Sequence, residues 1–177
     1  MAKNLPNDDL DLKIPIWDTD LAWLSGTNTY SLAACTAYCD VREYDTRGPR
    51  KPVISTKVFG NQNGHDIFQA KELYLSKIVQ SKLNDHHVYV VTQEGHPVMM
   101  DRRMNYKIVK KMFGSKGSVR DATTLIVPGI NGDQEVFISC GCDRFVRIFD
   151  PNATFKHQTE IGHIYLKQRL NSLIIMP

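Results

Sequence analysis

This sequence of 177 residues has no apolar run approaching the roughly 20 residues that cross a membrane as a helix. Its first nine residues are polar and acidic and do not read as a secretory signal peptide. These absences predict a soluble, intracellular protein with no membrane partner. A large charge excess is also missing, because 22 Lys and Arg face 19 Asp and Glu. The resulting charge of +3 permits contact with nucleic acid without requiring it.

Motifs for catalysis and for cofactor binding are missing too. The segment Gly114–Ser118 lacks the G-x-x-x-x-G-K-[ST] pattern of a phosphate-binding loop, and no nucleophile lies in a recognisable motif. Only four cysteines occur, and neither Cys35/Cys39 nor Cys140/Cys142 has the spacing of tandem zinc ligands. A metal site would need two further ligands from elsewhere. We therefore expect no catalytic residue, metal or cofactor, and interpret the cysteines as buried, reduced strand residues.

The most informative feature that is present runs from Ser139 to Asp150 and reads S-C-G-C-D-R-F-V-R-I-F-D. It predicts two short β-strands joined by a tight turn that contains Asp143. Asp side chains accept backbone N–H groups in turns, and Val146 and Ile148 fall on one face at a period of two. This order is typical of a blade of a WD-type β-propeller, which repeats such sheets around a central channel.

The same pattern recurs twice in weaker form. Residues 37–45 place Asp40 before a Val-Arg pair and end on an aromatic residue followed by Asp. A degraded copy, T-Q-E-G-H-P-V-M-M-D, occupies residues 92–101. The final aspartates of the three copies are 56 and 49 residues apart, close to the roughly 40–45 residues of a WD blade. We predict matching structural roles in the turns for Asp40 and Asp143.

The predicted fold is all-β: one domain, 1–177, with about three blades of a WD-type β-propeller at approximately 14–58, 65–112 and 117–167. Because propellers have about 4–8 blades, three repeats are expected to be part of a larger ring. The apolar tail 170–176 predicts a closing strand that pairs outside its own repeat, since its backbone groups need partners. Three unrelated strand–turn–strand units in another β fold are the alternative.

Several longer segments resemble one particular family. They are residues 2–4, 7–20, 35–38, 41–45, 50–53, 117–120, 139–144 and 165–171. In combination they are similar to the nucleolar WD-repeat factors of large ribosomal subunit assembly, a family that includes WD repeat-containing protein 74 of animals and a Nop-seven-associated protein of yeast. The likeness covers nearly the whole chain and thins between about 59 and 113. Four earlier blades and a basic carboxy-terminal tail of that family have no counterpart in this sequence.

The resemblance implies a seven-bladed propeller, of which this chain would hold the last three blades. It implies a non-enzymatic scaffold in pre-60S ribosomal particle assembly and pre-rRNA processing, located in the nucleus and nucleolus. The implied partners are other ribosome assembly factors, the pre-60S particle with its pre-rRNA, and an AAA-type ATPase that releases the protein. A generic WD-repeat adaptor for protein–protein interaction in another pathway is the alternative. An enzyme is a third hypothesis, which no residue set supports.

Two groups of residues are candidates for contact with a partner. The cations that could meet RNA phosphates or an acidic surface are Arg47, Arg50, Lys51, Arg120 and Arg144. Trp17 and Asp18 precede an inner strand, where loops reach one face of a propeller, and could bind a partner peptide. The ordinary alternatives are solvated surface charges and, for Trp17, burial between blades.

Overall fold

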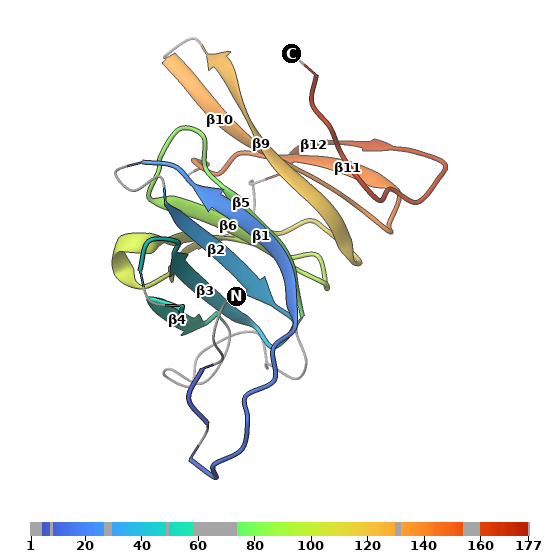
Figure 1. The fold of residues 1–177 in the computed structure, drawn as a ribbon. Helices are drawn as coiled ribbons and strands as arrows, with labels where there is room; N and C mark the ends of the chain where they lie inside the picture. The colour runs from blue at the N-terminus through green and yellow to red at the C-terminus, as the bar shows by residue number, and fades with distance from the viewer. Residues whose placement is uncertain are drawn as a thin grey trace.

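The computed structural model describes residues 5–7, 9–26, 30–48, 50–58, 74–129, 132–153 and 160–176. They form three four-stranded antiparallel sheets (Figure 1), and the predicted all-β class is confirmed. The first sheet holds β1 (Asp18–Leu24), β2 (Ser31–Thr36), β3 (Asp40–Asp45) and β4 (Ile54–Lys57). The second holds β5 (Leu75–Gln80), β6 (His87–Thr92), β7 (Pro97–Asp101) and β8 (Lys107–Lys111). The third holds β9 (Val119–Gly129), β10 (Gly132–Gly141), β11 (Phe145–Phe149) and β12 (Glu160–Tyr165).

Each sheet is paired in chain order, so its first strand lies at one edge and its fourth at the other. The first strands, β1, β5 and β9, are called the inner strands, and β5 contacts both of the others. Within the described ranges the one helical element is the short 3-10 turn η1 (Arg102–Met104), which joins β7 to β8.

The second sheet is buried on both faces, and β6 shows why its sequence is a nearly continuous apolar run. Val88 and Val90 join the core against the first sheet, whereas Tyr89 and Val91 join the core against the third. Side chains alternate along a strand, so a strand covered on both sides needs apolar residues at every position.

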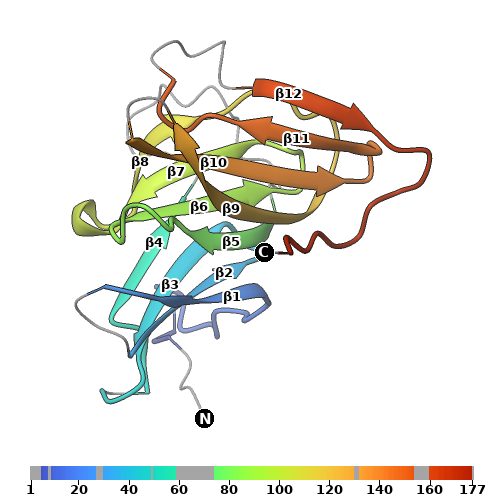
Figure 2. The same cartoon turned by 90° about the horizontal axis from the view of Figure 1, so that it is seen from above.

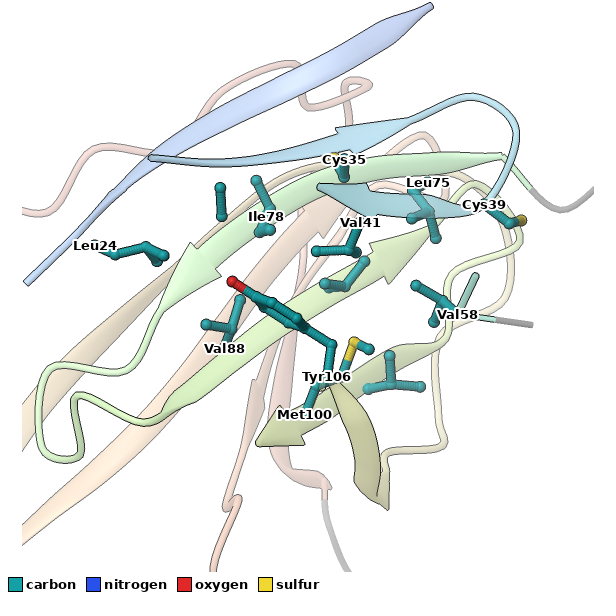
Figure 3. Close-up of a cluster of buried hydrophobic side chains, with 13 residues drawn as sticks. Leu24, Cys35, Cys39, Val41, Val58, Leu75, Ile78, Val88, Met100 and Tyr106 are labelled. Atoms are coloured by element: carbon teal, nitrogen blue, oxygen red, sulfur yellow. The ribbon is translucent and has the colours of Figure 1, made fainter. Parts of the chain in front are cut away.

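The first core lies between the first and second sheets (Figure 3). Side chains such as Cys35 and Val41 point from the first sheet toward Ile78, Met100 and Tyr106 of the second. The second core is aromatic: the ring centroid of Phe137 lies 5.1 Å from that of Tyr89 and 6.2 Å from that of Phe149. Both cores therefore join neighbouring sheets, and neither lies within one sheet.

Two buried carboxylates also join neighbouring sheets. Glu43 on β3 accepts from the hydroxyl of Tyr106 at 2.5 Å and from the guanidinium of Arg102 at 2.6 Å. Glu135 on β10 accepts from three donors of the second sheet: Ser81 Oγ at 2.6 Å, the Lys82 amide at 2.7 Å and the Tyr89 hydroxyl at 2.9 Å. Burial, followed by the neighbouring carboxylate, raises the pKa of both tyrosines, so both remain hydrogen-bond donors.

The inner strands are tied together by charge. Asp20, Lys77 and Asp121 occupy the same register position of β1, β5 and β9, opposite Cys35, Val91 and Cys140 respectively. Lys77 Nζ lies 3.5 Å from Asp20 Oδ2 and 3.2 Å from Asp121 Oδ1. Although burial opposes it, the two carboxylates raise the pKa of Lys77, which therefore stays charged between them.

The tail 170–176, predicted as a closing strand, is assigned no strand and pairs with no sheet in the described part of the protein. Figure 2 shows it turning back from β12 toward the inner strands. There the Leu173 amide donates to Asp121 Oδ2 at 2.8 Å. The Ile78 amide donates in the same way to Asp20 Oδ2 at 3.0 Å. Leu173 therefore lies beside β9 of the third sheet as Ile78 of β5 lies beside β1 of the first sheet. That the tail pairs with a further strand stays a prediction.

The turns that follow the second strand of each sheet share one backbone path. They span residues 37–39, 93–95 and 142–144, and the third residue of each has a positive φ: Cys39 +64°, Gly95 +95° and Arg144 +69°. In this register Asp143 matches Tyr38, whereas Asp40 matches Phe145 at the start of the next strand. The predicted equivalence of the two aspartates is therefore wrong.

The turn amides find different acceptors in the three sheets. Thr36 Oγ1 accepts from the amides of Tyr38 and Asp40 at 3.2 and 3.0 Å, and Thr92 Oγ1 accepts from His96 at 3.1 Å. The third sheet has Gly141 at this position, because a Cβ there would lie 2.4 Å from the Ser118 carbonyl oxygen. Asp143 supplies the acceptor instead, taking the Phe145 amide at 3.3 Å. The carboxylate of Asp40 pairs with a guanidinium, that of Arg42, at 3.3 Å.

The aspartate at the end of the third strand of each repeat, or directly after it in the case of Asp150, has one structural role in all three. Oδ1 of Asp45, Asp101 and Asp150 accepts from the amide two residues later, at 2.9, 2.8 and 2.7 Å respectively. Asp side chains make such contacts in turns, which explains why this residue recurs at the spacing seen in the sequence.

Replacing Asp101 with Ala is expected to destabilise the protein by about 2 kcal/mol, because the Arg103 amide loses its acceptor. The hydrogen bond from the Arg103 side chain holds the pKa of Asp101 below its ordinary 3.8, so this stabilisation is present above that pH and is lost as the pH falls through the lowered pKa. Urea unfolding at pH 7 and pH 3 measures both effects. The exposed Asp133→Ala variant is the control, and equal losses for the two variants would contradict the role of Asp101.

Asp143→Ala is expected to cost about 3 kcal/mol, chiefly because the buried Arg147 guanidinium then keeps only its longer ion pair with Glu160, at 3.9 Å. The side chains of Asp143 and Arg147 are 12% and 10% exposed. The cost should therefore shrink to about 1 kcal/mol, that of the turn hydrogen bond alone, when Arg147 is first replaced by Met. Chemical denaturation of the four proteins of this double-mutant cycle gives the coupling energy, and a coupling of zero would assign the whole effect to the turn.

Candidate functional site

One pocket of about 580 Å³ lies where the three inner strands begin. The residues just before these strands, Trp17, Tyr74 and Ser118, occupy equivalent places, because their carbonyls accept the first amide of each turn. Those amides belong to Ala37, Gln93 and Cys142, at 2.9, 2.7 and 2.9 Å. The pocket is lined by Trp17, Asp18, Thr19, Ala37, Tyr74, Leu75, Ser76, Gln93, Ser118, Val119 and Arg120. All three sheets therefore contribute to it.

An aromatic pair from two different sheets lines this pocket. The ring centroids of Trp17 and Tyr74 are 6.2 Å apart, with the planes tilted by 54°. Trp17 is nevertheless 58% exposed and Tyr74 37% exposed. Trp17 thus contacts the neighbouring sheet, but it is not buried between blades as the ordinary alternative predicted, and it presents apolar surface to a ligand.

Each inner strand carries a β-bulge at the edge of the pocket. The bulged residues are Thr19, Ser76 and Arg120, which the ladder to the next strand skips. Thr19 Oγ1 and Ser76 Oγ donate to the carbonyls of Cys35 and Val91, both at 3.1 Å. Arg120 is exposed and instead donates from Nε to Cys142 Sγ at 3.3 Å. A bulge re-aims its side chain, so the third sheet directs a guanidinium where the other two direct a hydroxyl.

The remaining predicted cations do not line this pocket. Arg144 is exposed in the turn of the third sheet and donates to the Tyr165 hydroxyl at 3.4 Å. Arg47, Arg50 and Lys51 lie between β3 and β4, at the opposite end of the first sheet from the pocket. Arg47 pairs with Asp45 at 3.3 Å and lies over the Tyr30 ring, whereas Arg50 and Lys51 are exposed. The structure therefore gathers Trp17, Asp18 and Arg120 and separates the basic turn from them.

Sequence reasoning missed Tyr74 as a site residue, and it missed the bulge that singles out Arg120. Tyr74 directly precedes Leu75, as Trp17 precedes Asp18 at the start of β1, so an alignment of the inner strands would have found it. The mismatch between Asp40 and Asp143 was also visible in the sequence. Counted back from the strand-ending aspartates, Asp40 stands five residues before Asp45, and Asp143 stands seven before Asp150.

All four cysteines are free, and three of them are buried. Burial raises the pKa of Cys35 to about 12 and those of Cys39 and Cys140 to about 11, so these thiols are protonated. Cys39 and Cys142 lie in turns, which corrects the interpretation that all four are strand residues. No cluster of three or more His, Cys, Asp or Glu able to hold a metal occurs in the part that the structure describes.

Among the described residues, no helix has the length and apolar character needed to cross a bilayer.

Known proteins resemble this chain in sequence. No protein-family model matches the chain. Human WD repeat-containing protein 74 is 31% identical over 176 residues, which are 98% of this chain and 39% of that protein. Ribosome biogenesis protein NSA1 of Saccharomyces cerevisiae (strain ATCC 204508 / S288c) is 27% identical over 191 residues, or 99% of this chain and 39% of that protein. The chain thus spans about two fifths of the length of the curated relatives that it matches.

Solved structures identify the fold. The WD40 β-propeller domain of Doa1 matches 90% of this chain with a TM-score of 0.63 and 16% identity, over 44% of that domain's chain. The WD40 repeats of RRP9 match 96% of this chain with a TM-score of 0.66 and 7% identity, over 46% of that chain. The three sheets are therefore WD-type blades. The resemblance in the sequence is confirmed: this chain has the fold of WD-repeat β-propeller blades and is similar in sequence to WD repeat-containing protein 74 and to Ribosome biogenesis protein NSA1.

Proposed function

We propose that this chain contributes part of a non-enzymatic scaffold for assembly of the large ribosomal subunit. The observation that carries the proposal is homology along 99% of the chain to a protein named for ribosome biogenesis. The propeller fold supports it, because such folds usually present surfaces to partners. The proposed location is the nucleus and nucleolus. The proposed partners are other assembly factors, the pre-60S particle with its pre-rRNA, and an AAA-type ATPase that releases the protein.

The fold suits this role because its blades are joined rigidly. Glu43 and Glu135 each accept hydrogen bonds across a boundary between sheets, and Lys77 bridges carboxylates of the first and third sheets. Surfaces on different blades therefore keep fixed relative positions. A scaffold needs that property, since partners bound at separate places must be held in one geometry.

The two ends of the sheets offer two different surfaces. The pocket end presents Trp17, Tyr74 and Arg120 around a cavity, which suits a segment of a protein partner. The other end of the first sheet presents the exposed Arg50 and Lys51 in a turn, which suits phosphate groups of RNA. We propose that the chain binds a protein partner at the pocket end and RNA at the opposite end.

Depleting the protein that carries this chain should lower mature 60S subunits and leave 40S subunits comparatively intact. Sucrose-gradient polysome profiles measure the 60S to 40S ratio, and re-expression of the wild-type protein should restore it. A ratio that stays unchanged after depletion would contradict the proposal and favour an adaptor in another pathway.

Replacing both Arg50 and Lys51 with Gln should weaken association with the pre-60S particle, because two phosphate contacts are lost. The slope of log association against log salt should fall by roughly 1.5 for two such contacts. Arg47→Gln is tested separately, since Arg47 also pairs with Asp45 and covers the Tyr30 ring. The control carries Lys13→Gln and Lys116→Gln, which remove the same charge from exposed positions elsewhere. Equal effects of the two double variants would exclude the basic turn as an RNA contact.

A further inference from the structure

The third blade differs from the first two in the residue at the bulge of its inner strand. At the bulge of the inner strand, Thr19 and Ser76 donate their hydroxyls to the backbone of the neighbouring strand. Arg120 occupies the same position with a long, charged side chain that leaves this backbone site and reaches the pocket. A residue that departs from a rule kept elsewhere in the same fold is a candidate for function, because it gives up a local hydrogen bond.

The guanidinium of Arg120 is positioned to bind an anion. Its Nε is used by Cys142 Sγ at 3.3 Å, and no described side chain takes its two terminal nitrogens. Cys142 itself is held by the hydrogen bond from its amide to the Ser118 carbonyl at 2.9 Å. The sulfur therefore fixes one edge of the guanidinium. Donors remain on its outer edge, which match the two oxygens of a carboxylate.

Trp17 and Tyr74 supply apolar surface in the same pocket. Both rings are substantially exposed and are therefore available to a ligand. Trp and Tyr rings commonly anchor ligands in pockets of this kind. The volume of about 580 Å³ is within the roughly 300–1,000 Å³ of small-ligand and peptide side-chain pockets. Groups that can bind a peptide backbone are also present, since Gln93 and Ser118 line the walls.

We infer that this pocket binds an extended peptide segment of a partner protein that carries one acidic side chain among uncharged neighbours. One aspartate or glutamate side chain of that segment pairs with Arg120, and an adjacent apolar side chain lies against Trp17 and Tyr74. This inference deepens the proposed function and rests on it only for the identity of the partner, an assembly factor. The binding chemistry itself follows from the pocket.

The charges around the pocket favour a peptide over RNA. Asp18 lines the pocket, Asp121 follows Arg120 on β9, and Asp143 lies in the turn beside Cys142. Asp121 and Asp143 are paired with Lys77 and Arg147, so the carboxylate that would chiefly repel the successive phosphates of a nucleic acid strand is that of Asp18. A peptide with a single carboxylate at Arg120 and neutral neighbours avoids this repulsion. Lys77, the nearest cation on the inner strands, is occupied by Asp20 and Asp121.

The test is selection from a displayed library of random heptapeptides on the purified full chain. The selected peptides should share an Asp or Glu next to an aromatic or aliphatic residue. A synthetic selected peptide should bind Arg120→Gln at least tenfold more weakly, measured by fluorescence anisotropy. Arg120→Lys should recover only part of the loss, because lysine lacks the planar pair of donors. Trp17→Ala should also weaken binding at least tenfold.

The matched control is Arg144→Gln, an exposed arginine at the same end of the third blade but outside the pocket, which should bind the peptide normally. Thermal melts of all variants verify folding. Selection that yields no acidic motif, equal binding by Arg120→Gln, or displacement of the peptide by oligouridylate at matched affinity would each overturn the inference. These outcomes leave the 60S to 40S ratio after depletion untouched, so failure of the ligand class is distinguished from failure of the scaffold function.

Discussion

The whole structure depends on one constraint: the second blade is a thin sheet with apolar residues on both faces, so it must be covered by a neighbouring blade on each side. β6 makes this plain, because Val88 and Val90 belong to one core and Tyr89 and Val91 to the other. Carboxylates then fix the angle between blades, since Glu43 and Glu135 each accept from donors of the second blade. A buried carboxylate without those donors would be strongly unfavourable, which makes these contacts selective for one arrangement.

The three blades repeat one backbone plan, and the positions where one blade departs from it are candidates for function. The three inner strands, their bulges and the turns beyond them follow one backbone plan. Most exceptions have a structural cause, as where Gly141 replaces a threonine and Asp143 supplies the acceptor that is lost. Arg120 is different, because it stands where the other two blades have a hydroxyl residue. It restores no lost contact and leaves a guanidinium exposed. Comparing equivalent positions within one chain therefore separates structural from functional exceptions.

The homology and the geometry support the proposed function at different levels. Similarity to Ribosome biogenesis protein NSA1 points to the cellular process, and it extends along 99% of this chain. The geometry points to surfaces: a pocket with an aromatic pair and an arginine at one end, and exposed cations at the other. The chain matches about two fifths of the length of these relatives, and these two surfaces are formed by its described residues.

The sequence by itself determined the fold class and the strand-ending aspartates, because alternation at a period of two and Asp in turns are local effects that neighbouring residues decide. It also determined the family resemblance, which is carried by residue identities. Only the tertiary structure decided that the tail meets Asp121 without joining a sheet, and that Trp17, Tyr74 and Arg120 share one pocket. These two facts depend on how segments that lie far apart in the chain meet, and such contacts leave no periodic signal in the sequence.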